Sequence, residues 1–80
     1  MKFYYVLFDS HNDGLEYEKT LKIRGVKYDI VPTPRYLRKS CGISIRIKCE
    51  IISGEELKVG RISGIYIVNS TTKEVEEYYN

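Results

Sequence analysis

Short runs of hydrophobic residues predict four strands along this 80-residue chain. These runs share a high content of β-branched and aromatic residues, and they cover residues 2–8, 26–31, 41–52 and 65–68. The first run is apolar at nearly every position, which indicates a central strand. The third run alternates most cleanly, because Ile43, Ile45 and Ile47 are separated by polar side chains.

The residues between the first two predicted strands favour a helix. Residues 14–25, GLEYEKTLKIRG, tolerate helical structure throughout, and Glu18 and Lys22 form a supporting i,i+4 pair. Gly25 has the place of a C-terminal cap. The preceding polar stretch offers three candidate N-caps: Asp9, Ser10 and Asn12.

A second, short helix is expected in residues 53–64, where Gly60 limits its length. The resulting order, β-α-β-β-α-β, predicts an α/β (α+β) ferredoxin-like sandwich, in which a four-stranded antiparallel sheet carries both helices on one face. We expect residues 1–68 to form this single domain. Residues 69–80 are expected to be a polar C-terminal tail, with a last helical turn started by the capping pattern of Thr71 and Glu74.

Composition and charge place the chain among soluble globular proteins. Hydrophobic residues make up 42% and charged residues 30%, and no apolar run reaches the roughly 18 residues of a membrane helix. The N-terminus lacks a signal-peptide pattern, so we expect a cytoplasmic protein. Residues 22–48 contain eight Lys or Arg but only one acid, Asp29. This excess indicates either an anionic ligand or partner, or a solvated face balanced by acids elsewhere.

The two cysteines, Cys41 and Cys49, do not form a disulfide framework. In an extended segment their Cα atoms lie about 26 Å apart, whereas a disulfide requires less than about 7 Å. Two thiols and the single histidine, His11, are too few for a closed zinc site. We therefore expect neither a metal nor another cofactor.

Residues 32–42, PTPRYLRKSCG, combine prolines, cations and a thiol. The prolines restrict the loop, and nearby cations stabilise a thiolate. A reactive thiol of this kind suits the transfer of sulfur or selenium. The candidate reactive residue is Cys41, and the candidate binding residues around it are Pro32, Thr33, Pro34, Arg35, Arg38, Lys39, Ser40 and Gly42.

A structural interpretation of the same loop stays open. A cysteine at the start of a strand is often a small buried hydrophobic residue, and Pro-Thr-Pro is typical of a turn between strands. We assign this packing role to Cys49, at the far end of the isoleucine face. His11 lies in the first strand–helix connection, which we place at the opposite end from Cys41, so we interpret it as a surface residue rather than a base.

The segment GVKYDIVPTPRYLRKSCGISIRI resembles a small bacterial family of selenium/sulfur (Se/S) carrier protein-like domains, otherwise of unknown function. The shared pattern is a strand, Pro-Thr-Pro-Arg at 32–35, a short spacer, Ser-Cys-Gly at 40–42, and an alternating strand. The similarity covers most of residues 3–67, although residues 53–64 are shorter and richer in glycine than usual. The resemblance implies a ferredoxin-like fold and a carrier thiol at Cys41.

Three functions follow from these observations. The favoured one is a sulfur or selenium carrier, which receives the atom from a donor of the cysteine desulfurase type and passes it to an acceptor enzyme, without turnover of its own. The alternative is a non-catalytic module for a small anion or a protein, in which Arg35 and backbone amides bind and Cys41 only packs. A nucleic-acid binder is the least favoured, since no recognised signature accompanies the tyrosines and cations. The oligomeric state stays open.

Overall fold

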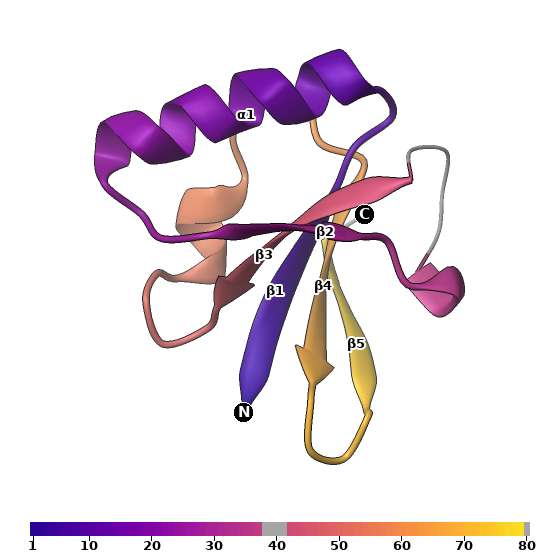
Figure 1. The fold of residues 1–80 in the computed structure, drawn as a ribbon. Helices are drawn as coiled ribbons and strands as arrows, with labels where there is room; N and C mark the ends of the chain where they lie inside the picture. Colours follow the sequence, from indigo (N-terminus) through magenta and orange to yellow (C-terminus); the bar gives the residue numbers. More distant parts are fainter. Residues whose placement is uncertain (38–41, 80) are drawn as a thin grey trace.

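The computed structural model describes residues 1–37 and 42–79 of the chain (Figure 1). It is an α+β fold in which one helix covers one face of an antiparallel five-stranded sheet with the strand order β2-β3-β1-β4-β5. The elements in chain order are β1 (Lys2–Leu7), α1 (His11–Arg24), β2 (Asp29–Pro32), the 3-10 turn η1 (Arg35–Leu37), β3 (Ile43–Lys48), the 3-10 turn η2 (Gly54–Leu57), β4 (Gly64–Asn69) and β5 (Val75–Tyr79).

The sheet agrees with the sequence prediction in part. The antiparallel pairing, the central position of β1 and the helix between β1 and β2 are confirmed. Strand β3 separates β1 from β2, so this part of the sheet is compatible with a ferredoxin-like arrangement. The predicted number of four strands is wrong, because β5 adds a fifth strand beside β4.

Two predicted helical segments are wrong. Residues 53–64 contain only the four-residue turn η2, and Gly60 takes a φ of +70° that interrupts any longer helix. The helical turn expected in residues 69–80 is replaced by a hairpin that leads into β5. There the Oδ1 atom of Asn69 accepts hydrogen bonds from the amides of Thr71 (2.9 Å) and Thr72 (3.1 Å), so these amides close a turn.

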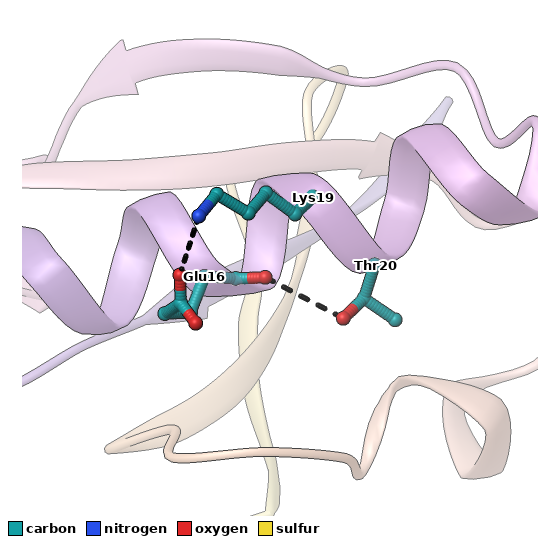
Figure 2. Close-up of polar contacts among 3 residues, drawn as sticks. All are labelled: Glu16, Lys19 and Thr20. Carbon is teal, nitrogen blue, oxygen red and sulfur yellow. Dashed lines mark hydrogen bonds and ion pairs between the residues drawn. The ribbon is translucent and has the colours of Figure 1, made fainter.

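Helix α1 begins and ends where the sequence indicates. The hydroxyl of Ser10 accepts a hydrogen bond from the amide of Asp13, and Gly25 closes the helix with a φ of +71°. The predicted Glu18–Lys22 ion pair is present at 3.4 Å. Figure 2 shows part of the exposed side of the helix, where Lys19 pairs with Glu16 at 3.0 Å.

The main core lies between α1 and the sheet. It contains the largest fully buried side chain, Phe8, whose ring centroid is 5.3 Å from that of Tyr17. The Tyr17 hydroxyl donates a hydrogen bond to the carbonyl of Leu57 (2.7 Å), which joins α1 to η2. On the same face Gly54 lies against Tyr78, and a Cβ atom at Gly54 would be 2.5 Å from the tyrosine ring. Strand β5 is therefore part of the packed structure.

A smaller cluster lies on the opposite face, which we call the open face. Its buried residues are Leu7, Leu37 and Val68, with Tyr5 and Tyr66 packed against them. Leu37 belongs to η1, so this turn folds back onto the sheet. Neither α1 nor η2 contributes a residue to this cluster, since both pack on the other side.

Candidate functional site

The strand registers bring three connections to one end of the sheet. Leu7, the last residue of β1, lies opposite Ser44 on one side and Gly64 on the other. Pro32, the last residue of β2, lies opposite Ile43. The connection after β1, the connection between β2 and β3, and the segment before β4 therefore lie at the same end.

This arrangement corrects the predicted place of His11. Strands β1 and β2 are both antiparallel to β3, so they run in the same direction and end on the same side of the sheet. His11, which opens α1 just after β1, is thus at the end of the sheet where β2 leads into the candidate loop, not at the opposite end. Its side chain is exposed, as expected for a surface residue.

The loop between β2 and β3 is held at both of its described ends. The amide of Thr33 donates a hydrogen bond to the carbonyl of Gly42 (2.9 Å). The amide of Leu37 donates to the carbonyl of Pro34 (2.9 Å) and closes η1. The Leu37 side chain is only 2% exposed, so its burial fixes η1 on the open face. These contacts leave a span of four residues between two fixed points.

The described site residues differ in exposure. Thr33 and Pro34 are half-buried, whereas Pro32, Arg35 and Gly42 are exposed. A Cβ atom at Gly42 would meet no described atom within 4 Å, so packing among these residues does not require glycine there. Four of the candidate residues lie outside the described residues: Arg38, Lys39, Ser40 and Cys41.

The first turn of α1 lies close to the start of β3. A Cβ atom added at Gly14 would be 3.7 Å from the Cδ1 atom of Ile43. Ile43 is the first residue of β3 and directly follows Gly42, the last residue of the loop. The N-terminus of a helix carries a partial positive charge and exposed amide donors. The position of the α1 N-terminus at this end of the sheet was not predicted from the sequence. It follows from the strand pairing, in which β1 and β2 run in the same direction.

Ser44 is a second feature that sequence analysis did not single out. It alternates with the isoleucines and so lies on the open face, yet it is completely buried. In the register it lies between Leu7 and Val31, and Leu7 in turn packs with Leu37. Among the described residues its Oγ atom has no hydrogen-bond partner. A buried hydroxyl without a partner is costly and rare in native structures.

Cys49 has the packing role predicted for it. It follows β3 at the far end of the sheet and packs, half-buried, against the main core. Burial raises the pKa of its thiol, and the nearby charge of Lys2 only partly opposes this effect. The Cys49 thiol is therefore protonated at neutral pH, which makes it a poor nucleophile.

The described part of the chain offers neither a metal site nor a membrane-spanning helix. Over residues 1–37 and 42–79, no group of three or more His, Cys, Asp or Glu side chains is placed to hold a metal ion. In the same part of the chain, no helix has the length and apolar character needed to cross a membrane.

Fold and site define a small α+β protein with a basic, anchored loop at one end of an antiparallel sheet. The chain belongs to the family described as "Putative Se/S carrier protein-like", whose family model matches residues 3–58. This match begins in β1, includes the whole β2–β3 loop and ends just after η2. Neither curated proteins nor solved structures gave a match.

Proposed function

We propose that this protein is a sulfur or selenium carrier and that Cys41 is its carrier thiol. The family description names this class of function, and its match includes the loop that contains Cys41. The observation that carries the proposal is the hydrogen bond between Thr33 and Gly42, since Gly42 directly follows Cys41 in the chain. Leu37, which precedes residues 38–41 in the chain, is also buried, so both described ends of the loop are fixed.

The surroundings of the loop favour the thiolate form of Cys41. Arg35 is exposed, and Arg38 and Lys39 add two further cations next to the cysteine in sequence. The N-terminus of α1 lies at the same end of the sheet and adds its partial positive charge. Cations and helix N-termini lower the pKa of a cysteine, so Cys41 reacts as a thiolate near neutral pH.

The transfer requires no external oxidant or reductant. The Cys41 thiolate attacks the terminal sulfur of a donor persulfide, R–S–SH, and the donor S–S bond breaks. The donor leaves as the thiolate R–S⁻, while Cys41 becomes the persulfide Cys41–S–SH. A donor R–S–SeH gives Cys41–S–SeH in the same way. Attack by an acceptor on the terminal atom then releases the Cys41 thiolate again.

Carrier activity implies protein partners on both sides of the transfer. One protein supplies the persulfide R–S–SH or its selenium analogue R–S–SeH, and a second accepts the atom. We place the exchange in the cytoplasm, where thiols are kept reduced. The carrier itself needs neither a metal nor an organic cofactor, because the exchanged atom moves directly between sulfur centres.

A small-anion site is the second candidate function. Arg35 is exposed beside the closed loop, and within the described part of the chain it forms no ion pair. A guanidinium in this position suits a phosphate or carboxylate. In this case Arg35→Ala removes anion binding, whereas Cys41→Ser leaves it unchanged.

The test is the alkylation rate of each cysteine as a function of pH, followed by mass spectrometry on the folded protein. We expect Cys41 to react with an apparent pKa well below the ordinary value of about 8.5, whereas Cys49 reacts slowly throughout. Incubation with a low-molecular-weight persulfide should add one sulfur to the wild type and to Cys49→Ala, but none to Cys41→Ser. A Cys41 that titrates like a free thiol, or that takes up no sulfur, would overturn the carrier function.

A further inference from the structure

A groove beside β2 and β3 gathers cations from the basic segment of the chain. It has a volume of about 430 Å³, and the cations that line it are Lys27, Arg46 and Lys48. Asp29 is the acid among its lining residues, so three cations against one acid leave an excess of two positive charges. By contrast, the groove along the outside of α1 is lined by two glutamates and two lysines, whose charges cancel. The excess beside β2 and β3 is therefore a local feature of this groove.

The guanidinium of Arg46 is held in place within the groove. Its Nη2 atom donates a hydrogen bond to the Oδ2 atom of Asp29 (3.1 Å), and its central carbon lies 4.9 Å from the centroid of the Phe3 ring. A guanidinium has five N–H donors, so the bond to Asp29 leaves others for a ligand. Because these contacts already order the long side chain, a ligand does not have to order it on binding.

The two lysines of the groove have no acid of their own. Within residues 1–37 and 42–79, neither Lys27 nor Lys48 forms an ion pair. The strand register brings them together, since Asp29 lies opposite Arg46 and each lysine is two residues further toward the same end of the sheet. Like charges in one groove repel each other, and an anion bound between them relieves this repulsion.

The rest of the groove is apolar. Phe3, Val26 and Tyr28 are half-buried, and Ile51 is 43% exposed. Ile51 lies beside the cations because its amide donates a hydrogen bond to the carbonyl of Lys48 (3.1 Å), which closes a turn after β3. A few charged groups next to apolar side chains are typical of sites for organic ligands. The groove thus suits an organic anion better than an inorganic ion.

We propose that this groove binds a small phosphate monoester whose organic part is apolar. A phosphate monoester carries a charge of about −1.5 to −2 at pH 7, which matches the excess of two positive charges. Lysine and arginine donate charge-assisted hydrogen bonds to the phosphate oxygens. The organic part then lies against Phe3 and Ile51. A carboxylate or a phosphodiester has one charge per group and leaves part of the excess unbalanced.

A long polyanion fits this surface less well than a small ligand. On the other side of the sheet, β5 has no lysine or arginine, and its Glu77 lies opposite Tyr66. A nucleic-acid strand or an acidic peptide that extends from the groove across the sheet meets this carboxylate, which repels it.

The groove is also separate from the loop that contains Cys41. Pro32 pairs with Ile43 at the loop end of β2 and β3, whereas Asp29 pairs with Arg46 toward the other end. The phosphate site therefore differs from the anion site considered for Arg35. It does not depend on Cys41 or on carrier activity, so the two proposals fail or hold independently.

The test is a titration of the isotope-labelled protein with phenyl phosphate, followed through the backbone amide NMR signals of Lys27, Arg46 and Lys48. We expect a dissociation constant of about 1 mM, as is typical of so small a ligand. Phenol lacks the phosphate, phenyl sulfate carries a single charge and inorganic phosphate lacks the ring. Each of these three probes should bind at least about fivefold more weakly.

Substitutions assign the binding to the groove. Lys27→Gln and Lys48→Gln each remove one charge from it and should weaken the binding of phenyl phosphate about fivefold. Lys19→Gln is the matched control, because Lys19 lies on α1 and its loss changes the net charge equally but leaves the groove intact. Ile51→Ser should weaken the binding of phenyl phosphate but not that of inorganic phosphate. Circular dichroism confirms the fold of each variant.

The proposal fails in any of three outcomes. In the first, about 20 mM phenyl phosphate leaves the amide signals of the groove unshifted, a concentration well above the expected dissociation constant. In the second, Lys19→Gln weakens binding as much as Lys48→Gln, so that net charge alone attracts the anion. In the third, a uridine decamer or a hexaglutamate peptide shifts the same signals at about a hundredfold lower concentration, which assigns the groove to a long polyanionic partner.

Discussion

Two leucines in short 3-10 turns pack against opposite faces of the same sheet. Leu57 of η2 is completely buried on the α1 side, where the main core surrounds it and its carbonyl accepts the Tyr17 hydroxyl. Leu37 of η1 is also buried, at 2% exposed, but its cluster contains only two other buried residues among those described, Leu7 and Val68. The α1 side thus supplies most of the stability, whereas the open face anchors the loop and leaves surface free for contacts.

The largest expected effect comes from Leu57→Ala. Truncation leaves a cavity inside the main core, where close neighbours limit collapse, so we expect a loss of about 4 kcal/mol in the free energy of unfolding. Urea denaturation followed by circular dichroism measures this loss. A loss of less than about 1 kcal/mol would show that η2 is not an integral part of the core.

A smaller loss is expected for Leu37→Ala. The open face can relax around the truncated side chain, so the free energy of unfolding should fall by about 2 kcal/mol. Tyr36→Ala is the control, because Tyr36 precedes Leu37 but is 63% exposed and should change stability by less than about 0.5 kcal/mol. If Leu37→Ala were as costly as Leu57→Ala, the two faces would not differ as described.

Leu37→Ala also tests whether packing on the open face affects the loop that contains Cys41. Leu37 fixes η1, which precedes the span that contains Cys41. Under the carrier proposal, Leu37→Ala should bring the apparent pKa of Cys41 closer to that of a free thiol, whereas Tyr36→Ala should leave it unchanged. Equal pH profiles of alkylation for both variants would show that anchoring by Leu37 does not activate the thiol.

The smallest expected change is a gain in stability. Ser44 buries a hydroxyl that has no partner among the described residues, so Ser44→Ala removes an unfavourable group at little cost in packing. We expect the free energy of unfolding to rise by about 1 kcal/mol. Ser53→Ala is the control, because Ser53 is exposed and its side chain caps no amide. Destabilisation by Ser44→Ala would mean that the hydroxyl has a structural role at this end of the sheet.

Local patterns were sufficient to predict much of the fold. The isoleucine alternation identified β3, and the Ser10 and Gly25 caps delimited α1, because these signals depend on neighbouring residues. Strand β2 covers only Asp29–Pro32 instead of residues 26–31. Before it, Val26 and Tyr28 pack against the main core, and the Tyr28 hydroxyl donates a hydrogen bond to Glu18. This tertiary contact has no signal in the local sequence.

The polar C-terminal segment shows the limit of such patterns. Val75–Tyr79 contains two glutamates and so resembles a solvated tail, yet it pairs with β4. Its strand is stabilised by contacts that are remote in sequence, chiefly Tyr78 against Gly54 and Tyr4. An edge strand needs few apolar residues, because only part of its surface is buried.

For the candidate site, the sequence predicted residue types but not their surroundings. The prolines, cations and thiol of the loop are visible as a motif, and the family match includes that motif. The proximity of the α1 N-terminus depends on the strand order, and Ser44 is buried although its place in β3 puts it on the open face. Both are long-range features that no spacing in the sequence encodes.

The central position of β1 has a consequence for how the chain folds during synthesis. This strand is synthesised before its neighbours β3 and β4, which follow some 40 and 60 residues later, and its first residue, Lys2, pairs with Asn69. Until those strands are available, the apolar segment KFYYVL has two unpaired edges and can associate with other nascent chains. Complete pairing of β1 must therefore wait until β4 is available, which leaves this apolar strand exposed for longer than the strands that follow it.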